Sequence, residues 1–477
     1  MTELFRKIKR DGALFGIASL YESAKRITVA FSGGADSSFL LKYFVYLRDS
    51  AESFPEITAF HVNHMIRGAE ADRDEELCRQ RCSEYGVPLE VRRINVPQMA
   101  AESGLGIEEC ARNARYNAFC QLRHNFGDGL LIATAHNADD NLETVLFNLA
   151  RGSGGNGLSG IPPVRDGYIL RPLLCLTGEE IRQGCGELGI PFAVDSTNSD
   201  EAYTRNFIRH SVVPLLKEVN PSAAEASVRS GAALREDEDF IRSLARDAVG
   251  QYLPDSLCTS AEVPRCIMAG LPEAVLSRAV VMLVGCVTGV AMSHEQIREC
   301  KRIIRGDGTG MVSLPDGVTF EVSKNLVCAG RVREAEPFSF ELQLPFGDEC
   351  VKYSCTEGGF DLFFCRNLQG LPQTDENIYK LSINTAVRFD TIYGRTFVRS
   401  RLPGDTLFLG GHTRRLKKMI CDRGIPKSDR DRLPVICDDE GVLLVPGLPV
   451  RGPAYARAED ISSGNVIYVL YCPYRRF

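Results

Sequence analysis

A short run of small, hydroxyl-bearing and acidic residues could bind a phosphate group together with a metal ion. Residues 32–38 read Ser-Gly-Gly-Ala-Asp-Ser-Ser and lie between the apolar residues 27–31 and a helical pattern that begins at Phe39. Glycines let a backbone approach a phosphate that a Cβ would hold away, and the free N–H groups of a helix N-terminus attract anions. The Asp36 carboxylate suits Mg²⁺. We therefore predict an anion-binding turn made by Ser32, Gly33, Gly34, Ala35, Asp36 and Ser37.

Three carboxylates and a histidine follow another apolar stretch. Residues 134–144 read Thr-Ala-His-Asn-Ala-Asp-Asp-Asn-Leu-Glu-Thr. Asp139 and Glu143 are four apart and share one face of a helix, with Asp140 adjacent. As a purely structural feature, acidic residues complement the dipole at a helix N-terminus. The interpretation that we favour is that they hold Mg²⁺ or recognise a cationic group, with His136 placed over the glycine turn.

A histidine-containing motif, His-Val-Asn-His, ends the apolar residues 57–62. His61 and Asn63 are two apart on a predicted strand and point the same way. A metal pair of His61 with His64 lacks a third ligand at a usual spacing. We favour a strand end that contacts a nucleotide, with ordinary hydrogen-bonded polar residues as the alternative.

Arginines recur in two later helical patterns. Arg112 and Arg115 are three apart, and Arg205 and Arg209 lie in a second group near the end of the same region. A solvated or ion-paired helix face is one interpretation of the first pair. Phosphate contact is the other, because the guanidinium group presents a fork of donors that matches a phosphate.

Alternating strands and helices must position these groups. A chain of this kind is typical of an α/β fold with a doubly wound parallel sheet, and such sheets bind ligands beyond the carboxyl ends of their strands. Each of the three motifs above begins where a predicted strand ends, so we expect them at one edge of the sheet. The predicted strands are residues 27–31, 57–62, 89–94, 130–134 and 192–194, and the predicted helices are residues 37–48, 71–85, 107–125 and 142–150.

The 477 residues exceed one ordinary core, so we expect several domains. Residues 1–215 form the predicted catalytic domain. Residues 216–335 are predicted to form a helical domain because their patterns up to about residue 305 are helical, and strands and turns are predicted to dominate from residue 306 onward. Residues 336–383 are predicted as a connecting segment, and residues 384–477 as a small α+β domain.

The overall composition indicates a cytoplasmic enzyme. The 17 cysteines include no Cys-x-x-Cys pair, which favours reduced thiols over a metal or iron–sulfur centre. The N-terminus has no hydrophobic signal core, and no apolar run reaches the roughly 20 residues that span a bilayer. The net charge of −6 excludes a uniformly basic nucleic-acid binder but leaves room for local basic patches.

The motifs taken together resemble the tRNA(Ile)-lysidine synthetase (lysidine synthase) family. The Ser-Gly-Gly-x-Asp-Ser spelling is that of the PP-loop of N-type ATP pyrophosphatases, which have a PP-loop, Rossmann-like fold. The resemblance covers about residues 25–215 and returns at residues 400–405 and 416–434. The matching motifs are residues 32–37, 61–64, 112–116, 134–144, 195–198 with 205–209, the glycine-rich residues 151–158, and Arg-Pro-Leu at residues 171–173.

This resemblance implies a two-step reaction on the wobble cytidine of an isoleucine tRNA with the anticodon CAU. ATP would adenylate the carbon-2 oxygen of the base, and the ε-amine of free L-lysine would then displace AMP to give lysidine. ATP and Mg²⁺ are the implied cofactors, with Asp36 as the metal ligand. The implied catalytic residues are Asp36, His136, Asp139, Asp140 and Glu143, and the ATP-binding residues are those of the turn together with His61.

A tRNA substrate requires a basic surface on this acidic chain. Residues 384–432 hold 12 Lys or Arg against 5 Asp or Glu, and the densest cluster is residues 414–418. Such a local excess is what phosphate binding needs. A merely solvated basic face is the alternative. The predicted residues that bind tRNA or phosphate are Arg112, Arg115, Arg205, Arg209, Arg414, Arg415, Lys417 and Lys418.

Three other functions compete with this interpretation. A PP-loop tRNA sulfurtransferase would need persulfide or cluster cysteines near the turn. A small-molecule carbon–nitrogen ligase of the GMP-synthetase kind would need an ammonia source and has no use for a basic tail. A non-enzymatic nucleotide-binding RNA module would not need Asp36, His136 or the acidic pair after it. The oligomeric state is left open, with a homodimer among the alternatives.

Overall fold

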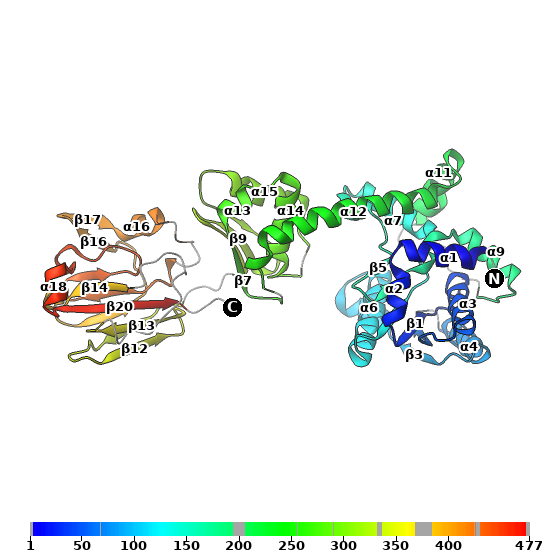
Figure 1. Cartoon of the computed structure of the whole chain (residues 1–477), viewed down its shortest axis with the longest axis horizontal. Coiled ribbons are helices and arrows are strands. Elements are labelled where there is room, and N and C mark those ends of the chain that lie inside the picture. Colours follow the sequence, from blue (N-terminus) through cyan, green and yellow to red (C-terminus); the bar gives the residue numbers. More distant parts are fainter. Residues whose placement is uncertain are drawn as a thin grey trace. The chain divides into compact units, whose positions relative to one another are not determined.

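The computed structural model (Figure 1) describes residues 3–66, 68–193, 206–254, 256–289, 291–331, 336–367, 384–423, 425 and 430–473. The chain divides into two compact units, Met1–Asp239 and Phe240–Phe477. The boundary falls inside the long helix α12 (Ala223–Val249). Within the described residues, no helix is long and apolar enough to cross a membrane.

The first unit contains a six-stranded sheet with the order β3-β2-β1-β4-β6-β5. Its neighbouring strands are parallel except at β5, which runs antiparallel to β6 at the edge. The predicted α/β fold with a parallel sheet is confirmed. The strands are β1 (Arg26–Ala30), β2 (Glu56–Asn63), β3 (Leu89–Arg93), β4 (Leu130–Ala133), β5 (Val164–Arg165) and β6 (Ile169–Leu170).

Helices connect the strands as the alternating pattern predicts. Strands β1 and β4 are almost fully buried, as expected of strands in a parallel sheet covered on both faces. Helix α3 packs so closely on α9 that a Cβ at Gly184 would lie 2.6 Å from the Phe39 ring. The helices of this unit up to residue 219 are α1 (Glu3–Leu14), α2 (Ile17–Ser23), α3 (Ala35–Ser50), α4 (Ala69–Glu84), α5 (Val96–Ser103), α6 (Ile107–Phe126), α7 (Ala138–Ala150), α8 (Gly155–Leu158), α9 (Gly178–Glu187) and α11 (Val213–Val219).

The predicted fifth strand at residues 192–194 is wrong where the structure describes it. Phe192 and Ala193 have irregular backbone, and the Ala193 N–H donates to the Gly33 carbonyl at 3.0 Å. The fifth parallel strand is β6, which pairs with β4 through Ile132 and Ala133. Two residues are too few to produce a readable strand pattern, so the sequence did not reveal it.

The region predicted as a helical domain contains an antiparallel sheet as well. Four strands form this sheet in the order β7-β10-β9-β8. The sheet packs with α13, α14 and α15 around one core. The prediction of purely helical structure up to about residue 305 is wrong, because β7 lies there and pairs with residues more than 60 positions later. The elements are β7 (Ser260–Pro264), α13 (Arg265–Ala269), α14 (Glu273–Gly285), α15 (His294–Arg305), β8 (Gly310–Ser313), β9 (Val318–Val322) and β10 (Leu326–Arg331).

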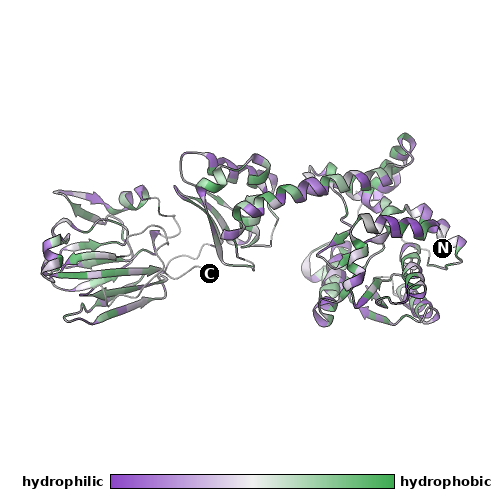
Figure 2. Ribbon diagram, in the orientation of Figure 1, coloured by the Kyte–Doolittle hydropathy of each residue, from purple (hydrophilic) through white to green (hydrophobic). Residues whose placement is uncertain are grey.

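The C-terminal part is built from two four-stranded sheets, β11-β15-β18-β19 and β12-β13-β20-β14, whose buried side chains share one core. Figure 2 shows hydrophobic residues concentrated along these strands. Three of the strands lie in the predicted connecting segment 336–383, so its described residues belong to this domain instead. The elements are β11 (Ser339–Leu342), β12 (Cys350–Cys355), β13 (Phe360–Cys365), β14 (Asn384–Arg388), β15 (Thr396–Arg399), β16 (Thr406–Leu409), β17 (His412–Arg415), α16 (Leu416–Asp422), β18 (Val435–Asp438), β19 (Gly441–Leu444), α18 (Ala458–Ser462) and β20 (Val466–Pro473).

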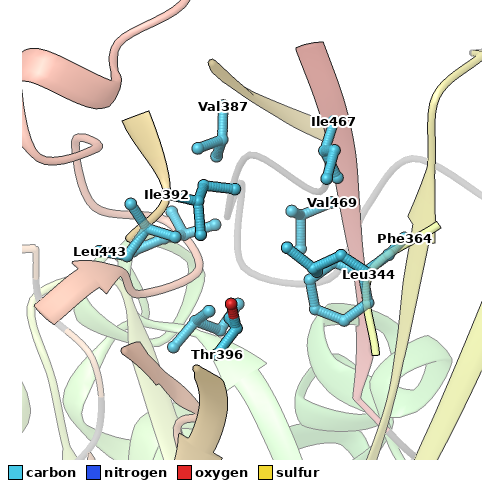
Figure 3. A pocket seen from close by; sticks show the side chains of 10 residues that line it. Leu344, Phe364, Val387, Ile392, Thr396, Leu443, Ile467 and Val469 are labelled. Atoms are coloured by element: carbon cyan, nitrogen blue, oxygen red, sulfur yellow. The ribbon is translucent and has the colours of Figure 1, made fainter. Parts of the chain in front are cut away.

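Two features of this sandwich concern the cysteines and a cavity. Cys350 and Cys365 face each other in the register of β12 and β13 and form a disulfide, so the expectation of reduced thiols is wrong for this pair. The other 15 cysteines, all within the described residues, form no disulfide. A cavity of about 10 Å³ lies among aliphatic and aromatic side chains such as Val387, Leu443 and Val469 (Figure 3). A void this small and apolar is a packing defect rather than a ligand site.

Candidate active site

The glycine turn connects β1 to α3 and is held by hydroxyl contacts. Gly33 has a φ of +87°, and a Cβ there would lie 3.3 Å from the Cys78 sulfur, so the position requires glycine. The Ser32 and Ser37 hydroxyls are 3.0 Å apart, and the Ser37 hydroxyl donates to the Gly34 carbonyl. Ser32 itself is exposed. The turn therefore presents the N-terminus of a 16-residue helix at the carboxyl end of β1.

His61 lies behind this turn. Its Nδ1 is 2.9 Å from the Phe31 carbonyl oxygen and 3.5 Å from the Cys78 sulfur, and its side chain is buried. These contacts join the end of β2 to the end of β1. They support the turn from within the protein, and ATP contact by His61 stays a prediction.

The polar end of β2 continues into a buried network around Glu75 of α4. Asn63 donates to this carboxylate at 3.1 Å, Arg79 at 2.8 Å and Arg93 through two bonds at 3.0 and 3.2 Å. Burial alone would raise the pKa of Glu75, but these hydrogen bonds outweigh it and lower the pKa to about 2. The network ties β2, β3 and α4 together beside the turn, and the sequence analysis did not find it.

The acidic motif begins α7 with a capping box. The Asn137 side chain accepts from the backbone N–H groups of Asp139 and Asp140, and Asp140 accepts from the Asn137 N–H at 3.0 Å. The purely structural interpretation, in which an acidic residue stabilises a helix N-terminus, thus explains one contact of the Asp140 carboxylate. Burial, followed by the charges of Glu143 and Asp36, raises the Asp140 pKa to about 6. A carboxyl group with this pKa can exchange protons near neutrality.

The other two carboxylates of α7 are paired with cations from the segment after residue 205. Arg209 donates two bonds to Glu143, at 2.6 and 3.0 Å, and lies 3.5 Å from Asp140. The Lys217 ammonium group of α11 is 2.8 Å from Asp139, whose other oxygen accepts from the Gly178 N–H at 2.9 Å. Arg209, predicted to bind tRNA or phosphate, therefore contacts the acidic cluster. Lys217 is a member of the site that the sequence analysis missed.

Asp36 connects the turn with the acidic motif. Burial raises the pKa of Asp36, while a hydrogen bond with the Asn137 side chain and the charges of Arg182 and Arg209 lower it. The structure thus brings Asp36 together with the start of α7, as expected for motifs that end neighbouring strands β1 and β4. Among the residues that the structure describes, no group of three or more His, Cys, Asp or Glu side chains could hold a metal ion by itself.

His136 lies at the end of β4, half-buried, with its Nδ1 3.0 Å from the Thr134 hydroxyl. The same hydroxyl is 3.4 Å from the Leu170 carbonyl oxygen at the end of β6. These contacts fix the histidine at the carboxyl edge of the sheet. Its role in the reaction stays a prediction.

The two arginines of α6 differ in their surroundings. Arg115 Nη2 is 3.4 Å from Nε2 of His64, and burial followed by the Arg115 charge lowers the His64 pKa to about 4. Arg112 lies 5.5 Å from the centre of the Tyr116 ring. The Tyr116 ring is also 4.5 Å from Arg165, and its hydroxyl accepts from the buried Arg171 at 3.3 Å.

Arg112 and Arg171 have no carboxylate partner in the described part of the chain, so this cluster around Tyr116 favours an anion. The sequence analysis named only Arg112, because residues more than 50 positions away complete the cluster. Arg171-Pro-Leu was visible as a motif and could have signalled it. Arg205 lies outside the described residues.

The basic cluster of the C-terminal domain lies on β17 and the start of α16. Leu416 and Ile420 of α16 are buried one helical turn apart, which leaves Lys417 and Lys418 exposed. Arg414 and Arg415 are exposed on the preceding strand. Within the described ranges, none of the four forms an ion pair with a carboxylate.

Comparisons with known proteins decide the family. The family model for the PP-loop domain matches residues 6–216, and the model for the TilS substrate C-terminal domain matches residues 397–461. The tRNA(Ile)-lysidine synthase of Geobacillus kaustophilus is 31% identical over 458 residues, which cover 90% of this chain and 92% of that protein. The chain belongs to the tRNA(Ile)-lysidine synthase family.

A second curated relative belongs to the same family. The tRNA(Ile)-lysidine synthase of Bacillus subtilis is 29% identical, with 88% of this chain and 89% of that protein covered. A solved structure of a U34-tRNA thiolase from Methanococcus maripaludis matches with 17% identity and a TM-score of 0.40, covering 49% of this chain and 78% of that one. The predicted enzyme class, a ligase that forms a carbon–nitrogen bond, follows from the family, which is favoured over the sulfurtransferase alternative.

Proposed function

We propose that this chain joins free lysine to carbon 2 of the wobble cytidine of an isoleucine tRNA with the anticodon CAU, using ATP and releasing AMP and pyrophosphate. The observation that carries the proposal is the meeting of Asp36, from the glycine turn, with the acidic start of α7. A site that activates an oxygen with ATP needs a phosphate cradle, and one that uses lysine needs carboxylates beside it. The glycine turn and the carboxylates of α7 follow neighbouring parallel strands, β1 and β4, at one edge of the sheet.

In the first step, the carbon-2 oxygen of the cytidine attacks the α-phosphorus of ATP and pyrophosphate leaves. The free N–H groups at the start of α3 and the hydroxyl of Ser32 would stabilise the charge on the departing group. The cluster of Arg112 and Arg171 around Tyr116 offers further positive charge for a phosphate of ATP or tRNA.

We propose that Mg²⁺ binds to Asp36 together with phosphate oxygens of ATP. Proteins commonly bind this ion through one or two carboxylates plus substrate phosphates, and Asp36 supplies one carboxylate within the turn. The bound ion would neutralise phosphate charge. The described residues offer no complete protein cage for a metal, which agrees with an ion that arrives with the nucleotide.

In the second step, the ε-amine of lysine attacks carbon 2, AMP leaves, and the amine loses a proton. We assign the proton to Asp140, because burial raises the pKa of this carboxyl group to about 6, close to neutrality. We assign recognition of the substrate's ammonium group to Asp139, because an alkylammonium group of the chain itself, that of Lys217, already lies 2.8 Å from it. Glu143 would hold Arg209 in place, and His136 would contact the adenylate or the base.

The finer partners belong to the same proposal. The basic residues 414–418 would bind the tRNA backbone, and the reaction would take place in the cytoplasm, where ATP, lysine and unmodified tRNA occur together. A homodimer is compatible with it and is tested by the mass of the purified protein in solution.

The deciding experiment is incorporation of radiolabelled lysine into an unmodified isoleucine tRNA with the anticodon CAU, with and without ATP. Incorporation that requires ATP is the expected result. The matched control is the same tRNA with cytidine 34 replaced by uridine, which should accept no lysine. Pyrophosphate release without lysine incorporation would retain the ATP chemistry but overturn lysine as the nucleophile.

A further inference from the structure

The C-terminal domain carries an open cleft that none of the proposed steps uses. Its volume is about 420 Å³, and its walls come from the hairpin β16–β17 and from residues 449–455. In Figure 1 the hairpin is drawn in orange at one end of this domain. The lining includes two aromatic residues, Phe408 and Tyr455, together with glycines that include Gly410 and Gly452.

Two aromatic side chains at this cleft remain open to solvent. Phe408 is 42% exposed and Tyr455 is 62% exposed, although the residues just before them, Leu407 and Ala454, are buried. The backbone at Gly452 lies close to the hairpin, because a Cβ there would be 3.7 Å from the Phe408 carbonyl oxygen and from the Gly410 nitrogen. Exposed aromatic rings that line a cleft suit a flat ligand, because a planar ring gains the most from stacking on an aromatic face.

Positive charge lies on the face of the β16–β17 hairpin that also carries Phe408. In the β16–β17 register, Phe408 is opposite Thr413 and Thr406 is opposite Arg415, so Phe408 and Arg415 project from one face. Arg415 is exposed and has no carboxylate partner within the described residues. An apolar stacking surface next to an unpaired guanidinium group matches a ligand that joins a flat ring to a negative charge, which is the chemistry of a nucleotide.

We propose that this cleft binds an unpaired nucleotide of the RNA substrate, with its base stacked on Phe408 and Tyr455 and its phosphate on Arg415. The proposal rests on the proposed function in that it takes RNA as the substrate. A duplex cannot insert a base without unstacking it, so the cleft distinguishes single-stranded RNA from double-stranded RNA. The residues at 414–418 alone would bind both forms through their phosphates.

The test is fluorescence anisotropy of the full chain with a short, labelled single-stranded oligoribonucleotide. Phe408→Ala and Tyr455→Ala should each raise the Kd by about tenfold, the usual size of one base-stacking contact, and should leave binding of the same strand in a duplex unchanged. Phe408→Tyr retains the ring and should bind like the unaltered chain, which separates stacking from damage to the hairpin. Phe346→Ala removes another exposed phenylalanine, 86% exposed and outside the cleft, and is the matched control.

Two results would overturn the proposal that the cleft binds a nucleotide. One is equal binding of single strand and duplex by the unaltered chain, and the other is an unchanged Kd for the single strand in both alanine variants. Lysine incorporation measured on the same proteins keeps the two proposals apart. If the unaltered chain incorporates lysine while the alanine variants bind the oligonucleotide normally, the proposed nucleotide site is wrong and the proposed function stands. If it incorporates none, the proposed function is wrong, and the anisotropy still reports on the cleft.

Discussion

The carboxylates of α7 at the catalytic edge of the first unit are paired with cations, whereas the basic cluster at residues 414–418 of the C-terminal domain is not paired with carboxylates among the described residues. Glu143 is held by Arg209, and Asp139 by Lys217. The four cations of β17 and α16 are exposed and have no carboxylate partner in the described part of the chain. One region has its charges arranged before any substrate arrives, and the other presents them to whatever approaches.

This difference separates chemistry from binding. Charges that are paired inside a site are already oriented, so they can stabilise a reaction without further rearrangement, and removing one leaves its partner uncompensated. Exposed, unpaired cations gain most of their binding energy by releasing counterions from a nucleic acid, and each contributes a similar small share. Single substitutions should therefore have large effects in the first region and small ones in the second.

The sharpest case is Asp36. Asp36→Asn keeps the size of the side chain and its capacity to bond Asn137 but removes the negative charge, so ATP-dependent pyrophosphate release should fall by about a thousandfold. Asp49→Asn, at an exposed position of the same helix, is the control and should release pyrophosphate normally. Release at an unaltered rate in the Asp36 variant would remove this residue from the catalytic group. The measurement is release of labelled pyrophosphate in the presence of tRNA.

Glu75 tests whether pairing also stabilises the catalytic domain. Glu75→Gln weakens the bonds from Arg79 and Arg93 and should lower the free energy of unfolding by about 2 kcal/mol. Because the pKa of Glu75 is about 2 when folded and ordinarily 4.5, its contribution is present above pH 4.5 and is lost as the pH falls toward 2. The variant should therefore lose part of the acid sensitivity of the unaltered chain. Urea unfolding at pH 7 and at pH 4 measures both effects, and parallel pH curves would contradict the assignment.

The basic hairpin is tested against a helix of the same unit whose cations are paired. Changing Arg414, Arg415, Lys417 and Lys418 to alanine should weaken tRNA binding by about tenfold or more and reduce the slope of log Kd against log salt by about 3. The control removes four cations of α15 that pair with glutamates, namely Arg298, Lys301, Arg302 and Arg305. If the control weakens tRNA binding equally, the affinity depends on the net charge of the protein and not on the four unpaired cations at residues 414–418.

The sequence predicted the first unit well because its information is local. Three of the first four strands, β1, β2 and β4, are largely apolar and end in a motif, and the parallel fold brings those ends to one edge. The same reasoning missed β6, which has only two residues, and β7, whose partner strand β10 lies far along the chain. It also misjudged residues 336–383, because β13 pairs with β20 more than 100 positions later.

For the site, the sequence indicated which residues gather but not how they pair. Asp139, Asp140 and Glu143 were predicted as a group from their helical spacing. Nothing in that spacing indicates that Lys217, more than 70 positions away, reaches Asp139, or that Arg171 completes the cluster at Tyr116. Such long-range contacts depend on how separate elements pack, which residue spacing does not encode.

The smallest expected effect concerns Lys217, and it tests the pairing at the catalytic edge most directly. If Asp139 receives the ammonium group of the substrate, Lys217 competes with lysine for it, and Lys217→Met should lower the KM for lysine by about threefold with little change in kcat. The factor is small because the Lys217 side chain is 34% exposed, and an ion pair so open to water is worth less than about 1 kcal/mol. Lys9→Met, at an exposed position of α1, should leave the KM unchanged. A raised KM for lysine would mean instead that Lys217 orients Asp139, and the pairing would then be part of the binding site rather than a substitute for its ligand.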